Sequence, residues 1–418
     1  MKFNKWTVAL AALGVVSFAS AAKAEEKASP VMTALSSTTI SGYVDTSAEW
    51  NIGTGNANLP PYRFNSPNKA DGFNLDVIQL RIDKPLDESD WAAGYRADLW
   101  FGPDANALGT SSTGVDTSDF AIRQAYVALR APLGTGLDFK MGVFDSIVGY
   151  ESIEAGNNPN FTRSFGNSIE PTTHTGLLAS YRFCDWFSAS AGVANTVGPT
   201  INGRASPTGN SLTGGDKAES YKTYMGSIAL TAPDSWGFLS GSTFYSGIVN
   251  GYNGNQAGVD ADGNTITVGN QISYYAGVTV ATPVTGLRLG AAFDILNVYS
   301  VNEFYSDGQT LAFSGYASYQ ATEKLSFHAR GEFFKDTQGV LLHDAVDGAG
   351  DPIPGTDPNK ILSMTATVQY DLWKNVISRL ELRWDHSLSG INAFGGTDAG
   401  QPSLINAWML AANVIYKF

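Results

Sequence analysis

The chain has 418 residues, of which 26 are Lys or Arg and 39 are Asp or Glu, so its formal net charge is −13. Such acidity argues against nucleic acid as a partner, and the single cysteine, Cys184, allows neither an internal disulfide nor a cysteine-based zinc site. A content of 45 Gly, 22 Phe and 18 Tyr with 16% charged residues is typical of strands, turns and aromatic belts, and it fits a soluble helical enzyme poorly.

The first 24 residues have the pattern of a secretory signal peptide. Lys2 and Lys5 precede an apolar run over 6–18, and Ala22-Lys23-Ala24 forms a small-residue cleavage site. A membrane anchor, the alternative, needs about 18 or more apolar residues, and this run is shorter. We therefore expect cleavage after residue 24, which leaves a mature charge of 23 minus 39, or −16. No other long apolar run follows, so any membrane span must be made of strands.

The segment 25–37 is short and polar, and we expect it to lie in the periplasm. From residue 38 onward the pattern indicates about 16 strands, an even number as a single-chain bacterial barrel requires. The predicted strands cover 38–50, 74–84, 91–101, 119–131, 136–145, 172–183, 186–196, 220–232, 237–249, 270–282, 287–299, 310–320, 324–336, 360–370, 375–386 and 406–418. The sequence therefore predicts an all-β fold over 38–418, a transmembrane antiparallel up-and-down β-barrel.

The connections between these strands alternate in length without a break. Tight turns, such as 132–135 and 283–286, alternate with long segments rich in Gly, Asn and Asp, such as 51–73 and 197–219. A soluble sandwich has no reason to place all its long loops at one end. An outer-membrane barrel does so, with short periplasmic turns and long extracellular loops.

Within the strands, charged residues keep to one parity. In 375–385, Leu380 and Leu382 alternate with Arg379, Glu381 and Arg383. A charge on the lipid face near the bilayer midplane costs about 2 to 4 kcal/mol, which explains the separation. The parity slips near residues 77–78 and near 123–124, where we expect β-bulges.

The last strand, 406–418, ends the chain on an aromatic residue. Trp408, Leu410, Val414, Tyr416 and Phe418 share one parity, and small or polar residues fill the other. Bacterial outer-membrane barrels typically end in this way, and the barrel-assembly machinery reads the terminal aromatic pair. Tyr416 and Phe418 are therefore the candidate assembly signal.

A barrel of about 16 strands leaves a water-filled channel. Charges of both signs line the predicted lumen, and mixed rings of this kind set ion preference through their local field. A solvated wall pair without any role in selectivity is the alternative for each residue. The candidate pore-wall residues are Arg81, Arg96, Arg123, Arg182, Arg330, Arg379 and Arg383.

Four short stretches carry a family resemblance: Ile122-Arg-Gln-Ala-Tyr126-Val, Gly142-Val-Phe144, Gly149-Tyr-Glu151 and Pro171-Thr-Thr-His174-Thr-Gly176. They resemble the β-barrel porin-2 (OmpL-like) family of bacterial outer-membrane porins, over nearly the whole mature chain. That resemblance implies pore formation and leaves the solute open.

The third long loop, 146–171, carries Glu151, Glu154 and Arg163 among aromatic residues. Loops of this length are usually functional or disordered. In general diffusion porins of similar length the third loop folds into the barrel. Carried over by that resemblance, Glu151 and Glu154 face wall arginines such as Arg81, Arg96 and Arg123 across a constriction. A loop that merely caps the barrel is the alternative.

Other motifs are weak. Asp260-Ala-Asp262-Gly-Asn264 begins like a calcium loop, but Thr265 and Gln271 stand where Gly and Glu are required. The four histidines show no metal-ligand spacing, so we expect neither a metal nor a cofactor.

The sequence thus predicts a porin of the Gram-negative outer membrane for passive diffusion of small hydrophilic solutes or ions. Lipid, lipopolysaccharide and possible homotrimer neighbours are the expected partners. One alternative is a structural or adhesive barrel with partner-binding loops. Another is an outer-membrane hydrolase using His328 or His386 with Asp385 or a loop serine. Cation or anion preference, gating and oligomeric state stay open.

Overall fold

The computed structural model describes residues 38–53, 55–112, 118–205, 218–252, 257–259, 265–300, 308–347 and 353–418. The predicted signal peptide (1–24), the segment 25–37 and the calcium-like loop (260–264) lie outside these ranges. Within the described ranges, no helix is both long enough and apolar enough to cross a membrane.

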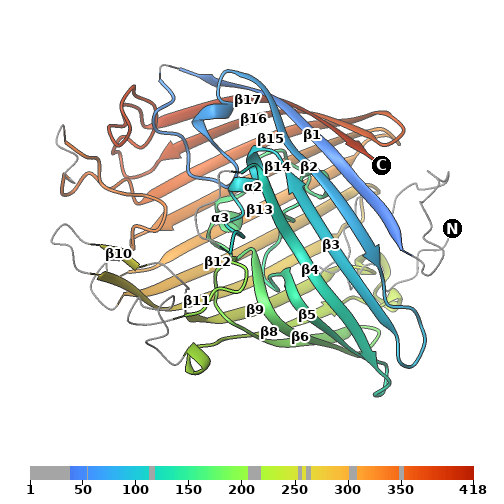
Figure 1. Cartoon of the computed structure of the whole chain (residues 1–418). Coiled ribbons are helices and arrows are strands. Elements are labelled where there is room, and N and C mark those ends of the chain that lie inside the picture. Colours follow the sequence, from blue (N-terminus) through green and yellow to red (C-terminus); the bar gives the residue numbers. More distant parts are fainter. Residues whose placement is uncertain are drawn as a thin grey trace.

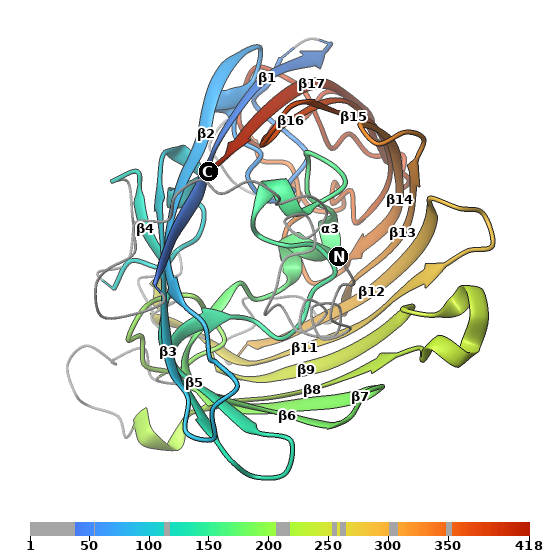
Figure 2. The same cartoon turned by 90° about the vertical axis from the view of Figure 1, so that its right-hand side faces the viewer.

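One antiparallel sheet closes on itself to form a barrel of sixteen strands, with the three-residue β10 paired only to β11 (Figures 1 and 2). The strands are β1 (Thr39–Ile52), β2 (Gly72–Lys84), β3 (Ala93–Phe101), β4 (Phe120–Ala131), β5 (Leu137–Asp145), β6 (Thr173–Cys184), β7 (Phe187–Ala194), β8 (Thr223–Thr231), β9 (Thr243–Tyr252), β10 (Ala257–Val259), β11 (Thr265–Ala281), β12 (Leu287–Ser300), β13 (Thr310–Gln320), β14 (Leu325–Asp336), β15 (Lys360–Trp373), β16 (Val376–Ser387) and β17 (Asn406–Lys417).

The helices of the described residues are short and lie in the connections. They are α2 (Pro103–Asn106), α3 (Phe165–Ile169) and the 3-10 helices η2 (Pro67–Lys69), η3 (Ala155–Asn157), η4 (Ala218–Ser220) and η5 (Asp234–Leu239). We call the end of the barrel with the tight turns the short-turn end, and the opposite end the long-loop end.

The barrel closes between its first and last strands. β1 pairs with β17 from Tyr43 opposite Lys417 to Ile52 opposite Trp408. Gly42 and Phe418 exchange two backbone hydrogen bonds, each 3.0 Å from nitrogen to oxygen. A Cβ on Gly42 would lie 2.7 Å from the Phe418 ring and 2.0 Å from the Gln79 carbonyl oxygen, so this seam needs glycine. The predicted closing strand is confirmed.

Two of the predicted strands begin later than expected. β8 starts at Thr223, after η4, and β9 starts at Thr243, because residues 234–239 form η5 instead of the start of that strand. Gly237 has a φ of +62°, which breaks the extended backbone. The predicted strand included Phe238, but this side chain is 56% exposed in η5 at the short-turn end.

The two slips in parity are register shifts in the sheet. The pairing of β1 with β2 shifts between Asp45 and Thr46, where Asp76 becomes the extra residue. The pairing of β3 with β4 shifts between Asp98 and Leu99, where Arg123 becomes the extra residue. Both bulges add a polar side chain to the lumen, and Arg123 becomes part of the site described below.

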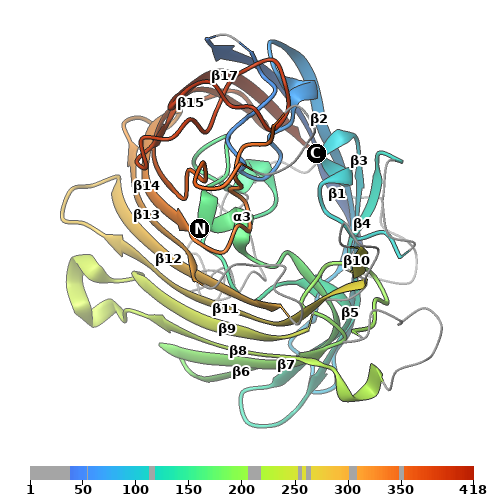
Figure 3. The ribbon, with the colours of Figure 1, turned by 90° about the vertical axis from the view of Figure 1, so that its left-hand side faces the viewer.

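The strands present an apolar face outward and a polar face inward. On β16, Leu380 and Leu382 are 52% and 42% exposed, whereas Arg379, Glu381 and Arg383 are no more than 4% exposed. Since these charged residues face the lumen and are still buried, something inside the barrel covers them. Figures 2 and 3 show the segment with α3 inside the ring of strands.

Candidate functional site

Residues 146–172 connect β5 to β6, and we call them loop L3. Ser146 donates its amide to the Thr172 carbonyl at 2.8 Å, which closes the base of the loop. Ile147 and Val148 then pack in one apolar cluster with Leu178, Met225 and other residues of the inner wall. Burial of these side chains turns L3 into the lumen instead of over the rim.

L3 also carries a second apolar contact with the opposite wall. Phe165 of α3 is fully buried, and its ring stacks on Phe334 of β14 with ring centres 4.9 Å apart. Ile169 belongs to the same cluster. The loop is therefore packed against the barrel at both ends of its path.

Glu154 is the point where L3 meets the β2 to β4 wall. Its Oε1 atom lies 3.2 Å from Arg123 Nη1 and 3.4 Å from Arg96 Nη2, and it also pairs with Arg81. The same three guanidinium groups bind Asp98 at 2.8 to 2.9 Å. The sequence prediction that Glu154 faces these arginines is thus met in the geometry, as direct ion pairs.

The environment of Glu154 favours its ionised form. Burial alone would raise the pKa of this carboxyl, but the nearby charges of Arg81, Arg123 and Arg96 outweigh burial and lower the pKa below its ordinary value. A carboxylate is therefore held at this point of the lumen at neutral pH.

Glu151 has different partners from those expected. Its Oε1 atom lies 2.9 Å from Arg330 Nη1, and its Oε2 atom accepts the Ser164 amide at 2.8 Å. The Tyr316 hydroxyl donates to Glu151 at 3.3 Å. Glu151 thus faces a predicted wall arginine, but it is Arg330 and not Arg81, Arg96 or Arg123. The chain turns between Glu151 and Glu154 and points the two carboxylates at opposite walls.

The predicted wall arginines of β14 and β16 hold L3 by its backbone. Arg330 donates to the Thr162 carbonyl, Arg383 to the Arg163 carbonyl and Arg379 to the Asn158 carbonyl, at 2.7, 2.7 and 2.8 Å. Each of the three is at most 4% exposed. They face the lumen as predicted, but L3 covers them, so they act as anchors in this structure.

Two carboxylates of the same wall receive backbone amides from L3. Glu381 accepts the Phe161 and Thr162 amides at 2.6 and 2.9 Å, and Glu332 accepts the Phe165 amide at 2.8 Å. Sequence reasoning placed both glutamates in the lumen and did not assign this role. The sequence signal for this role was that the two glutamates alternate with Arg330, Arg379 and Arg383 on the lumen face of their strands. Buried charges on one face require hydrogen-bond or ion-pair partners.

The remaining predicted residues lie away from the Glu154 cluster. Arg163 donates to the Ile153 carbonyl at 2.9 Å and lies over the Phe64 ring at 5.5 Å, so it stabilises the shape of L3 itself. Arg182 lies at the short-turn end, 3.5 Å from Asp185. The structure does not bring either residue to Glu154.

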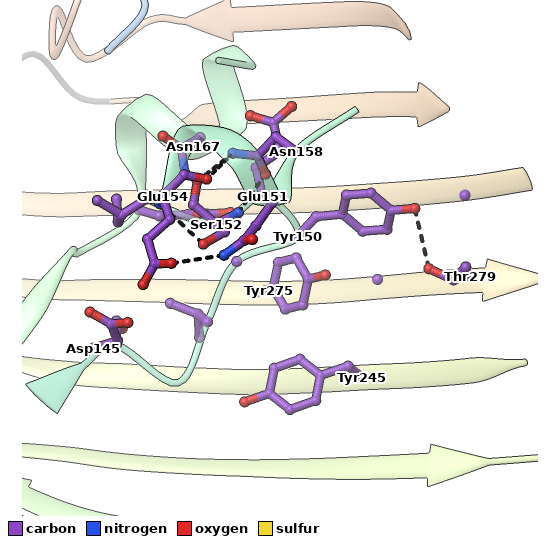
Figure 4. Close-up of a pocket in the computed structure, with 18 of the residues that line it drawn as sticks. Asp145, Tyr150, Glu151, Ser152, Glu154, Asn158, Asn167, Tyr245, Tyr275 and Thr279 are labelled. Carbon is purple, nitrogen blue, oxygen red and sulfur yellow. Dashed lines mark hydrogen bonds between the residues drawn. The ribbon is translucent and has the colours of Figure 1, made fainter. Parts of the chain in front are cut away.

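A cavity of about 350 Å³ runs between L3 and the wall from β9 to β13. Figure 4 shows Tyr245 and Tyr275 on this wall, with the Tyr150 ring beside them and its hydroxyl accepting from Thr279 at 3.2 Å. The lining extends from Arg63, in a long loop, to residues near the short-turn end. The charged, tyrosine and hydroxyl side chains of the lining include Arg63, Arg81, Arg96, Arg123, Asp145, Tyr150, Glu151, Glu154, Glu170, Tyr245, Tyr275, Thr279, Arg288, Tyr316 and Ser318. Arg63 and the tyrosines were not predicted, since no local pattern marks them.

The histidines do not form the hydrolytic sites considered from the sequence. Asp385 binds Arg383 at 2.9 Å, whereas His386 Nδ1 lies 2.9 Å from the Asn406 side-chain oxygen. His328 hydrogen-bonds two wall serines. The described part of the chain also holds no group of three His, Cys, Asp or Glu residues that could bind a metal ion.

A closed sixteen-strand barrel with an apolar exterior, a charged interior and a loop folded into its lumen defines the porin class of outer-membrane channels. The chain belongs to the family described as "Putative beta-barrel porin-2, OmpL-like", whose model matches residues 37–418. This is the family that the sequence motifs resembled. The protein is therefore a porin of the bacterial outer membrane, a channel for passive diffusion.

Solved porin structures share this fold at low sequence identity. The outer-membrane channel DcaP of Acinetobacter baumannii is 12% identical, with a TM-score of 0.55 over 91% of this chain and 97% of that chain. An anion-selective porin from Comamonas acidovorans is 13% identical, with a TM-score of 0.54 over 91% and 99%. OmpF of Salmonella typhi, in complex with daunomycin, is 14% identical, with a TM-score of 0.54 over 91% and 97%. No curated protein matches the chain.

Proposed function

We propose that small hydrophilic solutes cross the membrane through the cavity between L3 and the wall from β9 to β13, and that Glu154 and its three arginines form the charged constriction. One observation carries the proposal. L3 is anchored on β14 and β16, yet Glu154 reaches guanidinium groups of β2, β3 and β4. The loop thus spans the lumen and leaves solutes the route on its other side.

The constriction combines opposite charges at contact distance. Arg81, Arg96 and Arg123 face the carboxylates of Asp98, Glu154 and Asp145, the last at 2.6 Å from Arg123. Such a cluster orients water and polar solutes and keeps apolar molecules out. No energy source is needed, because diffusion follows the concentration gradient.

Single-channel recording of Glu154→Gln tests this proposal. The loss of one negative charge should change conductance and shift the reversal potential in unequal KCl toward anions, by about threefold in permeability ratio for one charge at about 6 Å in water. Asp90→Asn removes an equal charge from an exposed turn and should leave both values unchanged. Equal values for Glu154→Gln and the unmodified protein would remove Glu154 from the pore.

The same recordings address the alternative of a structural or adhesive barrel. A porin shows discrete conductance steps in a planar bilayer, whereas a barrel sealed by L3 shows none. The cavity of about 350 Å³ beside the loop supports the first outcome.

The cellular form that we propose is a mature chain that starts at Glu25 after signal-peptide cleavage. The assembly machinery would insert it among lipid and lipopolysaccharide. A homotrimer is the oligomer we favour, since one solved structure with this fold, OmpT of Vibrio cholerae at 12% identity, is described as a trimer form. Intact mass of the purified protein and its native mass in detergent test these points.

A further inference from the structure

The charges that face Glu154 on the β2 to β5 wall balance one another. Counting Glu154 itself, which belongs to L3, the cluster joins three guanidinium groups, of Arg81, Arg96 and Arg123, to three carboxylates, of Asp98, Asp145 and Glu154. Opposite charges at contact distance largely cancel their long-range field. This cluster is thus close to neutral, and ion preference depends on charges elsewhere in the lumen.

Arg288 is a lumen cation without such compensation. It is the second residue of β12, next to a tight turn at the short-turn end, and its side chain is exposed. Among the residues that the structure describes, it makes no ion pair. It lines the cavity beside L3, together with Tyr150.

Arg288 also lines a second cavity, of about 340 Å³, at the short-turn end. Ser318 lines both cavities, so the two adjoin along this wall. His328 lies in the second cavity, with its ring nitrogens 2.9 Å from Ser318 Oγ and 3.0 Å from Ser326 Oγ. The lining residues of this cavity include hydroxyl, amide and imidazole groups and no carboxylate.

We propose that Arg288, with the neighbouring Ser318 hydroxyl, binds small oxyanions such as carboxylates and phosphates at the short-turn end of the pore and sets its preference for anions. A guanidinium group matches the geometry of two oxygen atoms of such an anion. Hydroxyl groups complete the hydrogen bonds, and no carboxylate among the lining residues of this cavity competes with the anion for the guanidinium group. This inference rests on the proposed pore.

Reversal potentials in a tenfold KCl gradient test the preference. We expect the unmodified porin to favour chloride, and Arg288→Gln to lower the chloride-to-potassium permeability ratio by about threefold or more, the effect of one charge at about 6 Å in water. Arg288→Lys keeps the charge and should keep the preference. Lys360→Gln removes an equal charge from an exposed position at the long-loop end of β15 and should behave like the unmodified protein.

Inorganic phosphate and acetate test binding directly. Each should reduce chloride current in the unmodified protein and in Lys360→Gln, with a half-blocking concentration roughly tenfold higher in Arg288→Gln. Block by phosphate alone or by acetate alone also supports the site and names the preferred oxyanion.

Assembly of each variant is checked by its heat-dependent mobility on gels, and Arg288→Ser repeats the test with a smaller side chain. Discrete steps with unchanged permeability ratio and unchanged block in Arg288→Gln would overturn the role of Arg288 while leaving the pore intact. Absence of steps in the unmodified protein would overturn both the pore and the oxyanion site.

Discussion

Glu151 Oε1 and Arg330 Nη1 lie 2.9 Å apart inside the barrel, although 179 residues separate them in the chain. Their side chains are 1% and 0% exposed. Arg330 also binds Glu332 at 2.8 Å, so one guanidinium joins a loop residue to its own strand. This pair fixes where L3 lies, and therefore which side of the lumen stays open.

Replacing Arg330 should release L3 from β14. Arg330→Met leaves Glu151 buried without its cation and Glu332 with only Arg383, 3.9 Å away, and breaking a buried pair in this way typically costs about 3 to 5 kcal/mol. We expect a lower free energy of unfolding in urea and faster protease cleavage within L3. Arg130→Met, which breaks a partly exposed pair with Asp138, should cost about 1 kcal/mol or less and leave L3 resistant. Equal effects of the two substitutions would contradict the anchoring role.

Asp98 should control the charge of the constriction. It is fully buried and binds three guanidinium groups, so Asp98→Asn leaves one positive charge in excess. We expect a shift of the reversal potential toward anions by about threefold in permeability ratio. Asp90→Asn, on the exposed turn, is the matched control. No shift in a correctly assembled barrel would show that ions do not pass near Asp98, and a shift toward cations would contradict the charge assigned to the constriction.

The barrel and its two faces could be predicted from the sequence because period-two alternation is a local property that the membrane enforces. Arg379, Glu381 and Arg383 show it plainly on β16. The direction of Glu151 could not be predicted, because it depends on a turn within L3 and on Arg330, far away in the chain. Tyr245 and Tyr275 line the cavity only because β9 and β11 pair, and no local pattern records that pairing.

Protonation of Glu170 should make barrel stability depend on pH. Burial, together with the nearby charge of Glu151, raises the pKa of Glu170 to about 7. A hydrogen bond from the Asp294 carboxyl and the charge of Arg63 lower the pKa and offset part of this rise. A raised pKa means that the protonated form stabilises the fold. This contribution, on the order of 3 kcal/mol, is fully present below about pH 4.5 and is lost as pH rises through about 7.

We therefore expect the urea midpoint of the unmodified protein to fall between pH 5 and pH 8.5. Glu170→Gln keeps a neutral side chain at both values and should flatten this dependence. Glu219→Gln, on an exposed loop, should not change it. A midpoint that rises with pH would reverse the sign and refute this account of Glu170.

Phe418 should be needed for assembly in cells and not for stability of the finished barrel. Its ring is 43% exposed on the outer face, and its backbone bonds to Gly42 do not depend on the side chain. Phe418→Ala should reduce the amount of folded protein in the outer membrane while leaving refolding into detergent unchanged. Phe327→Ala is the matched control, since that ring is 44% exposed on the same face but lies within β14.

The two substitutions remove similar apolar area from lipid, so they should cost similar free energy in the refolded state. The two substitutions should differ only if the assembly machinery recognises the aromatic ring of Phe418. If Phe418→Ala and Phe327→Ala reduce outer-membrane levels equally, the terminal ring is an ordinary lipid contact. If Phe418→Ala also prevents refolding in detergent, the ring closes the seam beside Gly42 structurally, and the assembly role is unnecessary.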